Sequence, residues 1–149
     1  MEISFLSIDV SHALYPEWFS LRQRLLRDPL GISFSEKEHQ AEQEDHQLVA
    51  LAGEQLLGGL LIRTAGLPLG SWKIRQVAVD PVFQGKGIGR RLMEEVIRRA
   101  RVEGIEQLVL HSRKPVCGFY EALGFEVVGE PFEEVGIPHR KMILSLAFP

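Results

Sequence analysis

Three glycines at alternate positions make the segment 84–90, with the sequence QGKGIGR, a candidate for ligand binding. Glycines allow a sharp backbone turn and bring several N–H groups close to a single ligand. The segment lies between an expected strand and an expected helix start, where the helix dipole adds positive potential. We therefore expect it to bind a phosphate or pyrophosphate group. Its residues are Gln84, Gly85, Lys86, Gly87, Ile88, Gly89 and Arg90.

The spacing of this segment departs from two common nucleotide-binding loops. A P-loop ends in a Gly-Lys-Ser/Thr triplet, but here Arg90 follows Gly89, and no Ser or Thr is present to bind magnesium. A dinucleotide-binding loop has a glycine where Arg90 stands and a carboxylate about 20 residues later, where this chain has His111. A glycine-rich turn without a ligand is the alternative on spacing alone.

Length, charge and cysteine content limit the partners of such a site. The 149 residues, with 45% apolar and 25% charged side chains, suit a single domain spanning 1–149. A net charge of −3, from 17 Lys and Arg against 20 Asp and Glu, gives no overall positive field to attract nucleic acid or an anionic membrane. Cys117 is the only cysteine, which excludes internal disulfides and multi-cysteine metal sites. We therefore expect no metal, no nucleic acid and no membrane, and an anion held by local geometry.

The sequence also carries no targeting signal that we recognise. Residues Met1–Phe5 lack the basic flank and apolar stretch of a signal peptide. The longest apolar run, Leu56–Ile62, contains two glycines and is far shorter than the roughly 20 residues of a membrane span. A single cysteine is compatible with a reducing compartment. These features predict a cytoplasmic globular protein.

Hydrophobic periodicity and turn residues predict a mixture of strands and helices. Ser11 is the expected N-cap of the first long helix, and Ser35 with Glu38 has the spacing of a capping box. The strands that flank the longest helix should run parallel, joined by a right-handed crossover. The expected strands are 2–8, 48–52, 55–64, 71–79, 107–111, 125–128 and 140–146, and the expected helices are 11–28, 35–42, 88–103 and 115–123.

The expected strand 71–79 has an irregular apolar pattern. Trp72 and Ile74 lie on one alternation phase, whereas Val77 and Val79 lie on the other. Because side chains alternate between the two faces of a strand, the apolar face shifts by one residue around Arg75-Gln76. A β-bulge at this point would absorb the shift. The alternative is a strand buried on both faces, in which alternation carries no information.

Two separated motifs in this order resemble the GCN5-related N-acetyltransferase (GNAT) family. The first is Val77–Pro81 followed by Gln84-x-x-Gly87-x-Gly89, and the second is the FYE-x-x-GF sequence of Phe119–Phe125. The resemblance covers the chain from about Val49 to the C-terminus, and the order of elements also fits. It implies an α/β fold, with a mixed, strongly twisted sheet that contains a splayed parallel strand pair and is flanked by helices.

The resemblance also implies a ligand and roles for named residues. Acetyl-CoA would be the co-substrate, with its pyrophosphate held by the backbone amides of Gln84–Arg90. The amides around Val77 and Val79 would pair with the pantetheine arm as an added strand. The Val77 N–H would polarise the acetyl carbonyl, and Tyr120 would protonate the departing thiolate. A tyrosine packed in the core is the alternative for Tyr120.

The general base is not defined by the motifs. Many relatives carry a glutamate early on the bulged strand, where this chain has Lys73, Arg75 and Gln76. Three sources of deprotonation stay open: the imidazole of His139, Glu133 or Glu134 acting through water, and the small neutral fraction of the amine itself. Residues 132–142 resemble a bacterial branch of the family with a Gly-Ile-Pro-His sequence, which places His139 near the acceptor if its loop folds over the cleft.

Other residues carry weaker hypotheses. The asparagine that often follows the next strand is replaced here by Ser112 and Arg113. Cys117 would be an acyl acceptor or a small buried residue. Five acidic residues would attract a cationic amine or form a solvated helix face. They are Glu36, Glu38, Glu42, Glu44 and Asp45.

The resemblance and the candidate residues together favour one activity. We expect an N-acetyltransferase that moves an acetyl group from acetyl-CoA to a primary amine of a small molecule or peptide by direct attack. The alternative is an acyl-CoA-binding sensor without catalysis, which the missing strand glutamate keeps open. We expect a monomer or a homodimer, with the strand 140–146 available to pair with a second copy.

Overall fold

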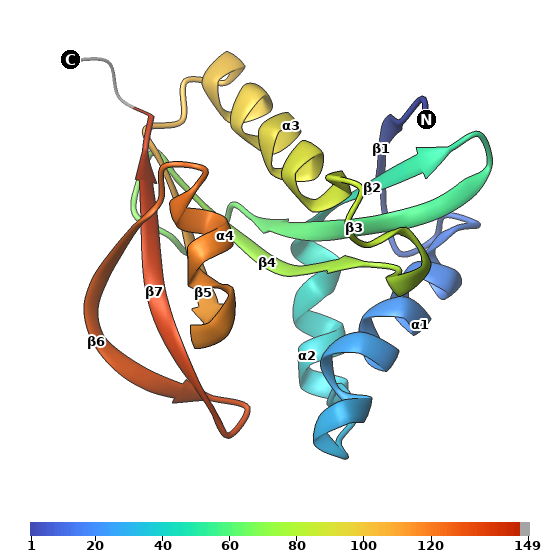
Figure 1. The fold of residues 1–149 in the computed structure, drawn as a ribbon, viewed down its shortest axis with the longest axis horizontal. Helices are drawn as coiled ribbons and strands as arrows, with labels where there is room; N and C mark the ends of the chain where they lie inside the picture. The colour runs from blue at the N-terminus through green and yellow to red at the C-terminus, as the bar shows by residue number, and fades with distance from the viewer. Residues whose placement is uncertain (147–149) are drawn as a thin grey trace.

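A seven-stranded mixed sheet organises the protein (Figure 1), which is described here as a computed structural model covering residues 1–146. The strand order is β1-β2-β3-β4-β5-β7-β6, in which only β4 and β5 are parallel neighbours. The parallel pair and the helix between these strands were expected from the sequence. The strands are β1 Ser4–Ile8, β2 His46–Ala52, β3 Gln55–Arg63, β4 Ser71–Val79, β5 Gln107–Arg113, β6 Glu126–Glu134 and β7 Ile137–Ser145.

Helices cover both faces of the sheet (Figure 1). The α-helices are α1 Tyr15–Leu26, α2 Glu36–Ala41, α3 Ile88–Val102 and α4 Cys117–Glu121, and the short 3-10 helices are η1 Asp28–Leu30, η2 Glu42–Glu44, η3 Pro81–Phe83 and η4 Lys114–Val116. Leu48 and Ala50 of β2 belong to the core under α3 and α4, whereas Val49 and Leu51 belong to the core under α1. Burial on both faces explains the continuous apolar runs of the central strands. None of the described helices is both long and apolar enough to cross a membrane.

The parallel pair separates along its length. Ser71–Ile74 pair with Gln107–Leu110, and beyond Ile74 strand β4 continues to pair only with β3. The β3–β4 register shifts where Leu60 faces two residues, Gln76 and Val77, and Gln76 has a positive φ of 53°. This geometry is a β-bulge. The bulge predicted from the shifted apolar pattern is therefore confirmed.

The start of α1 differs from the expectation. Leu14, rather than Ser11, is the N-cap, and the first turn contains Pro16. The backbone N–H and the hydroxyl of Ser11 both donate to Asp9 Oδ1, so the serine closes a tight turn before the helix instead of capping it. The capping box of α2 is confirmed, because Ser35 and Glu38 exchange both of its hydrogen bonds.

The C-terminal strands are longer than expected and form a hairpin. Segment 132–139, expected as a loop, continues β6 to Glu134 and begins β7 at Ile137, with a turn of two residues. Val135 and Gly136 both have positive φ, 48° and 77°, as a tight hairpin turn requires. Strand β7 lies between β5 and β6, so both of its edges are paired. The expectation that 140–146 could pair with a second copy is therefore wrong.

Candidate active site

The end of β4 presents free amides at the point where the parallel pair separates. The Asp80 N–H donates to the Leu57 carbonyl of β3 at 2.8 Å. Because successive N–H groups of a strand point to opposite sides, the N–H groups of Val79 and Val77 point away from β3, toward the gap beside β5. The gap therefore offers backbone donors to an extended ligand, and the use of Val77 and Val79 for this purpose stays a prediction.

The glycine-rich segment forms a turn that leads directly into α3. Gly85 and Gly87 have positive φ of 79° and 76°, and Gly87 is the N-cap of the helix. The first N–H groups of a helix have no partner within the helix, so this turn directs several donors outward. Ile88 is 1% exposed and anchors the turn in the core. Outward-facing donors of this kind can bind a phosphate group, and pyrophosphate binding by Gln84–Arg90 stays a prediction.

Side chains around this turn fix it relative to the neighbouring elements. The Gln84 amide donates to the Val79 carbonyl at 3.2 Å, which joins the turn to the end of β4. A Cβ atom at Gly89 would lie 3.4 Å from the Phe119 ring, so α3 begins very close to α4. Arg90 forms a 3.6 Å ion pair with Glu94 on the surface of α3. Lys86 and Arg90 are the nearby cations in the sequence that would neutralise a phosphate.

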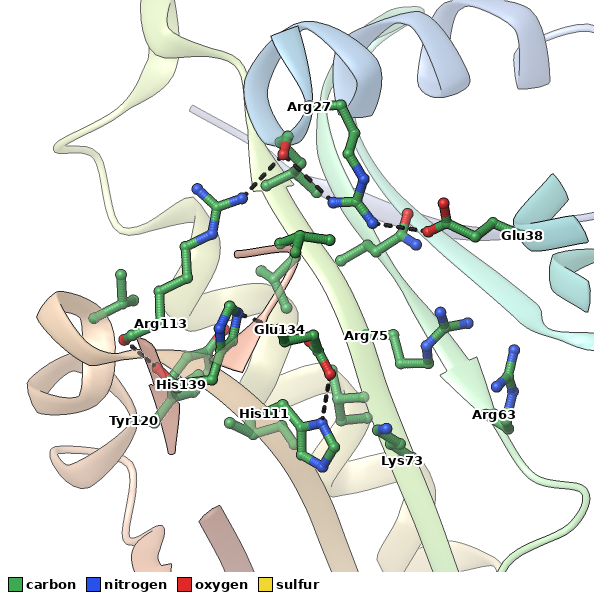
Figure 2. Close-up of a pocket in the computed structure, with 18 residues that line it drawn as sticks. Arg27, Glu38, Arg63, Lys73, Arg75, His111, Arg113, Tyr120, Glu134 and His139 are labelled. Atoms are coloured by element: carbon green, nitrogen blue, oxygen red, sulfur yellow. Dashed lines mark hydrogen bonds and ion pairs between the residues drawn. The ribbon is translucent and has the colours of Figure 1, made fainter. Parts of the chain in front are cut away.

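A cavity of about 450 Å³ lies on the other side of the gap (Figure 2). Its walls come from the end of α1, from α2, from β3, β4 and β5, from η4 and α4, and from the tip of the β6–β7 hairpin. None of the residues 84–90 lines it. Val77 lines it at the bulge. Its titratable side chains are Arg27, Glu38, Arg63, Lys73, Arg75, His111, Arg113, Tyr120, Glu134 and His139.

Tyr120 enters this cavity from α4. The residue is 8% exposed and packs edge-on against Phe119 and Phe125, with ring centroids 5.0 and 5.8 Å away. Burial raises the pKa of its phenol to about 12, so the hydroxyl is protonated at neutral pH. A buried phenol that lines the same cavity as Val77 can donate a proton to a group that binds in this cavity.

Cys117, one turn before Tyr120, is buried and does not line the cavity. Its Sγ atom lies 3.8 Å from the Arg113 carbonyl. These positions favour the small buried residue over the acyl acceptor for Cys117.

His139 and Glu134 face each other across the hairpin end of the cavity (Figure 2). The His139 Nδ1 atom lies 2.9 Å from the Ile137 carbonyl, which can only accept, so Nδ1 carries the hydrogen. The His139 Nε2 atom lies 3.7 Å from Glu134 Oε2. An imidazole in this tautomer can accept a proton at Nε2, and the carboxylate would stabilise the resulting positive charge.

A second histidine completes this group. His111 Nδ1 donates to Glu134 Oε1 at 2.9 Å, and its ring packs edge-on against Phe132. The hydrogen bond from His111 and the nearby positive charge of Lys73 hold the pKa of Glu134 below its usual range, despite an opposing effect of burial. Glu134 is therefore ionised at neutral pH and lies between two imidazoles.

The structure brings four of the predicted site residues to one cavity: Val77, Tyr120, Glu134 and His139. Val79 and Gln84–Arg90 do not line it, and Gln84–Arg90 form the glycine-rich turn that leads into α3. Glu133 does not line the cavity, because it precedes Glu134 on a strand and its side chain points to the opposite face. Of the two glutamates considered as bases, only Glu134 lies at the site.

Two cavity residues were not predicted from the sequence. His111 was not identified as a site residue, and Arg113 was not assigned to the cavity. Both lie on the face of β5 opposite to Leu108 and Leu110, which are buried in the core. Strand alternation through Val109, His111 and Arg113 is the signal that could have placed them on one face. The expected strand ended at His111, so this pattern was cut short.

The acidic segment 36–45 does not present free carboxylates to the cavity. Glu42 is 2% exposed and bonds to Arg22, and Asp45 bonds to Arg63 and Arg75 at 3.0 and 2.9 Å. Glu38 bonds to Arg27 at 2.8 Å. Both expectations for this segment, attraction of a cationic amine and a solvated helix face, are therefore wrong for Glu42 and Asp45.

A family comparison agrees with this geometry. The sequence model described as an acetyltransferase (GNAT) domain matches residues 32–146. The N-alpha-acetyltransferase RimI of Mycobacterium tuberculosis is 32% identical over 90 residues, which are 60% of this chain and 57% of that protein. The chloroplastic GCN5-related N-acetyltransferase 1 of Arabidopsis thaliana is 46% identical over 52 residues, 35% of this chain and 26% of that protein. The chain therefore matches about a quarter of the length of the Arabidopsis protein and just over half of the length of the Mycobacterium protein.

Solved structures share the fold over nearly the whole chain. A Lactobacillus plantarum protein described as an N-acetyltransferase superimposes with a TM-score of 0.82 at 22% identity, covering 97% of this chain and 99% of that one. A GNAT family acetyltransferase from Elizabethkingia anophelis, solved with acetyl-CoA bound, gives a TM-score of 0.72 at 20% identity, covering 97% and 98%. The family match covers most of this chain, and the fold is the same. The chain therefore belongs to the GNAT acetyltransferase family.

Proposed function

We propose that this protein, as one domain spanning residues 1–149, transfers the acetyl group of acetyl-CoA to a primary amine of a small molecule or peptide by direct attack. One observation carries the proposal: the free amide of Val77 at the strand separation and the hydroxyl-bearing ring of Tyr120 line the same cavity. Membership of an acetyltransferase family and a structural neighbour with acetyl-CoA bound support it.

Two parts of the chain would hold the coenzyme. The amides of the turn Gln84–Arg90 would donate to its pyrophosphate, with Lys86 and Arg90 as local cations. The free amides of Val77 and Val79 would pair with the pantetheine arm, which would fill the gap beside β5 as an added strand. The arm then directs the thioester from the turn toward the cavity.

Val77 and Tyr120 would act on the two ends of the breaking bond. A C–N bond forms between the acceptor nitrogen and the acetyl carbon, and the C–S bond breaks. The Val77 N–H would stabilise the negative charge that develops on the carbonyl oxygen. Tyr120 would give its proton to the departing thiolate, because a phenol with a raised pKa is still protonated at neutral pH.

His139 is the better placed of the two candidate bases. Its Nδ1 hydrogen is committed to the Ile137 carbonyl, so Nε2 is free to take a proton from the acceptor amine. Glu134 is a weaker base, because its pKa is held low by His111. Glu134 would instead stabilise the protonated imidazole across the 3.7 Å separation. We therefore assign His139 as the base and Glu134 as its supporting anion.

Binding and turnover test this proposal in sequence. Calorimetric titration with acetyl-CoA should show binding at one site, and thiol release with a panel of primary amines should then show turnover. An absence of coenzyme binding would refute the proposal. Binding without turnover on any amine would instead support the acyl-CoA sensor, which the replacement of the strand glutamate by Lys73, Arg75 and Gln76 favours.

A further inference from the structure

The cavity is positively charged, although the chain as a whole carries a net charge of −3. The carboxylates that line it are Glu38 and Glu134. Cationic side chains outnumber them and come from the C-cap of α1 and from β3, β4 and β5. They are Arg27, Arg63, Lys73, Arg75 and Arg113. An excess of one sign in a concave site selects ligands of the opposite sign.

Part of this positive charge is already neutralised within the protein. Arg63 and Arg75 share Asp45, whose side chain is 1% exposed and lies behind the cavity wall. Arg27 pairs with Glu38 at 2.8 Å. Within residues 1–146, Lys73 and Arg113 line the cavity and have no carboxylate within ion-pairing distance. The excess charge is therefore located at identifiable side chains.

Arg113 is held in position for a ligand. Its Nη2 atom donates to the Leu26 carbonyl at 3.0 Å, and the same oxygen accepts from Arg27 Nη1 at 3.4 Å (Figure 2). The Arg27 guanidinium also lies over the Phe34 ring, 4.4 Å from its centroid. Two guanidinium groups thus meet at one carbonyl, and among the described residues 1–146 Glu38 is the carboxylate that pairs with them. The planar fork of such groups matches the geometry of a carboxylate.

These cations are not explained by the coenzyme. The phosphate-binding turn, Gln84–Arg90, contributes no residue to the cavity, so the proposed phosphate site and the arginine pair lie on different sides of the strand separation. The arginines face the space left for the acceptor. The hairpin end of the same cavity holds the ionised Glu134 and the imidazole of His139, which suit an amino group.

We propose that the acceptor is a small primary amine that also carries a carboxylate, as an amino acid does. Arg113, supported by Arg27, binds the carboxylate, and the amino group lies between Glu134, His139 and the acetyl carbon. This inference rests on the proposed acetyl transfer and names its substrate class. A cavity of about 450 Å³ limits the acceptor to a few residues at most.

Matched pairs of amines test the charge requirement. Glycine, β-alanine and 4-aminobutyrate place the carboxylate at increasing distances from the amine, and their amides remove its charge with little change in size. A comparison of ethanolamine phosphate with ethanolamine shows whether a phosphate group on the acceptor raises kcat/KM. Spermidine shows whether a second positive charge on the acceptor does so. We expect the highest kcat/KM for one of the three carboxylates. A preference for spermidine, for the amides or for ethanolamine phosphate would overturn the proposal.

Substitution of Arg113 separates charge recognition from differences in amine basicity. Arg113→Gln should raise KM for the preferred carboxylate about 10- to 100-fold and leave KM for its amide within about twofold, because only the carboxylate loses a charge-assisted contact. Arg101→Gln makes the same charge change on the exposed surface of α3 and should alter neither value. Arg113→Lys should restore part of the loss. Equal effects of Arg113→Gln on both substrates would refute the carboxylate contact.

A binding measurement keeps this inference independent of catalysis. In the presence of coenzyme A, calorimetry should detect the preferred carboxylate with the wild-type protein and a weakened signal with Arg113→Gln. If transfer fails on every amine but this binding pattern holds, the proposed function is wrong and the carboxylate site stands. If transfer proceeds but no carboxylate binds better than its amide, the substrate class is wrong and the proposed function stands.

Discussion

The Arg22 guanidinium donates a hydrogen bond of 2.8 Å to Oε1 of Gln76, the residue with positive φ in the β4 bulge. Arg22 is fully buried and also bonds to both carboxylate oxygens of Glu42. A non-glycine residue in the left-handed region is strained and persists only when its surroundings hold it there. A buried ion pair between α1 and η2 thus holds the bulge that directs the Val77 amide into the gap.

The first prediction concerns the buried ion pair itself. Glu42→Gln should lower the free energy of unfolding by roughly 3 to 5 kcal/mol, because it leaves the Arg22 charge buried without a counterion. Burial alone would raise the pKa of Glu42, but bonds from Arg22 and Tyr15 hold it below the usual range, so the carboxylate is charged at neutral pH. Urea unfolding measures the change, with Glu36→Gln on the exposed surface of α2 as control. Equal stabilities of the two variants would contradict the prediction.

The second prediction concerns the backbone of the bulge. Gln76→Val should cost about 1 to 3 kcal/mol of stability and weaken acetyl-CoA binding, since a β-branched residue disfavours positive φ. Gln76→Asn should lose less than Gln76→Val in both measurements, because asparagine tolerates positive φ more readily than most residues, although its shorter side chain weakens the bond to Arg22. Urea unfolding and calorimetry provide the two readouts. The prediction is falsified if valine binds the coenzyme as tightly as asparagine does.

The bulge was predictable from sequence because its signal is local. The shift between Trp72 and Ile74 on one phase and Val77 and Val79 on the other lies within one strand. The same holds for the capping box at Ser35 and for the glycine-rich turn. Motif order then supplied the family, and with it the positions of Val77 and Tyr120.

Beyond His139 and Glu134, the acceptor side was not predictable because its contacts are distant in sequence. Asp45 is buried by arginines 18 and 30 positions away, which nothing in an acidic segment indicates. The β6–β7 hairpin was also missed, because Pro131, Gly136 and Pro138 are typical of a loop, whereas pairing with β5 extends both strands. The ion pairs and arginines that line the cavity therefore depend on contacts between segments that are distant in sequence.

The third prediction tests the phosphate-binding turn. Gly87→Glu should abolish acetyl-CoA binding, because it introduces a negative charge and a side chain at φ 76°, next to the first N–H groups of α3. Gly104→Glu is a matched control: its φ is 73°, and it lies just beyond the other end of the same helix. Calorimetry should show loss of binding only for the first variant. If both variants bind equally, the turn does not hold the phosphates.

The fourth prediction tests Tyr120 as the acid. Tyr120→Phe should lower kcat about 100-fold and leave the acetyl-CoA Kd within about twofold, because the variant loses a proton donor but keeps the ring. The pKa of about 12 also means that deprotonation of Tyr120 causes no loss of activity below pH 10. Thiol release at fixed acceptor concentration gives kcat, and Phe119→Leu is a control for ring packing beside the site. Full activity of Tyr120→Phe would remove Tyr120 from the mechanism.

The last prediction separates His139 from Glu134 by pH. His139→Gln should lower kcat and flatten the rise of kcat/KM with pH, because the variant has no imidazole to deprotonate the amine. Glu134→Gln should lower kcat less and keep that rise, since the base is still present.

The stability of Glu134→Gln provides an independent readout. Because the folded pKa of Glu134 lies below its unfolded value of 4.5, its stabilising effect is present above pH 4.5 and is lost as the pH falls through the folded pKa. The difference in unfolding free energy between wild type and Glu134→Gln should therefore shrink in acid.

The pH dependence of kcat/KM decides between the two roles. If kcat/KM loses its rise with pH in Glu134→Gln but keeps it in His139→Gln, the two roles are exchanged and Glu134 is the base.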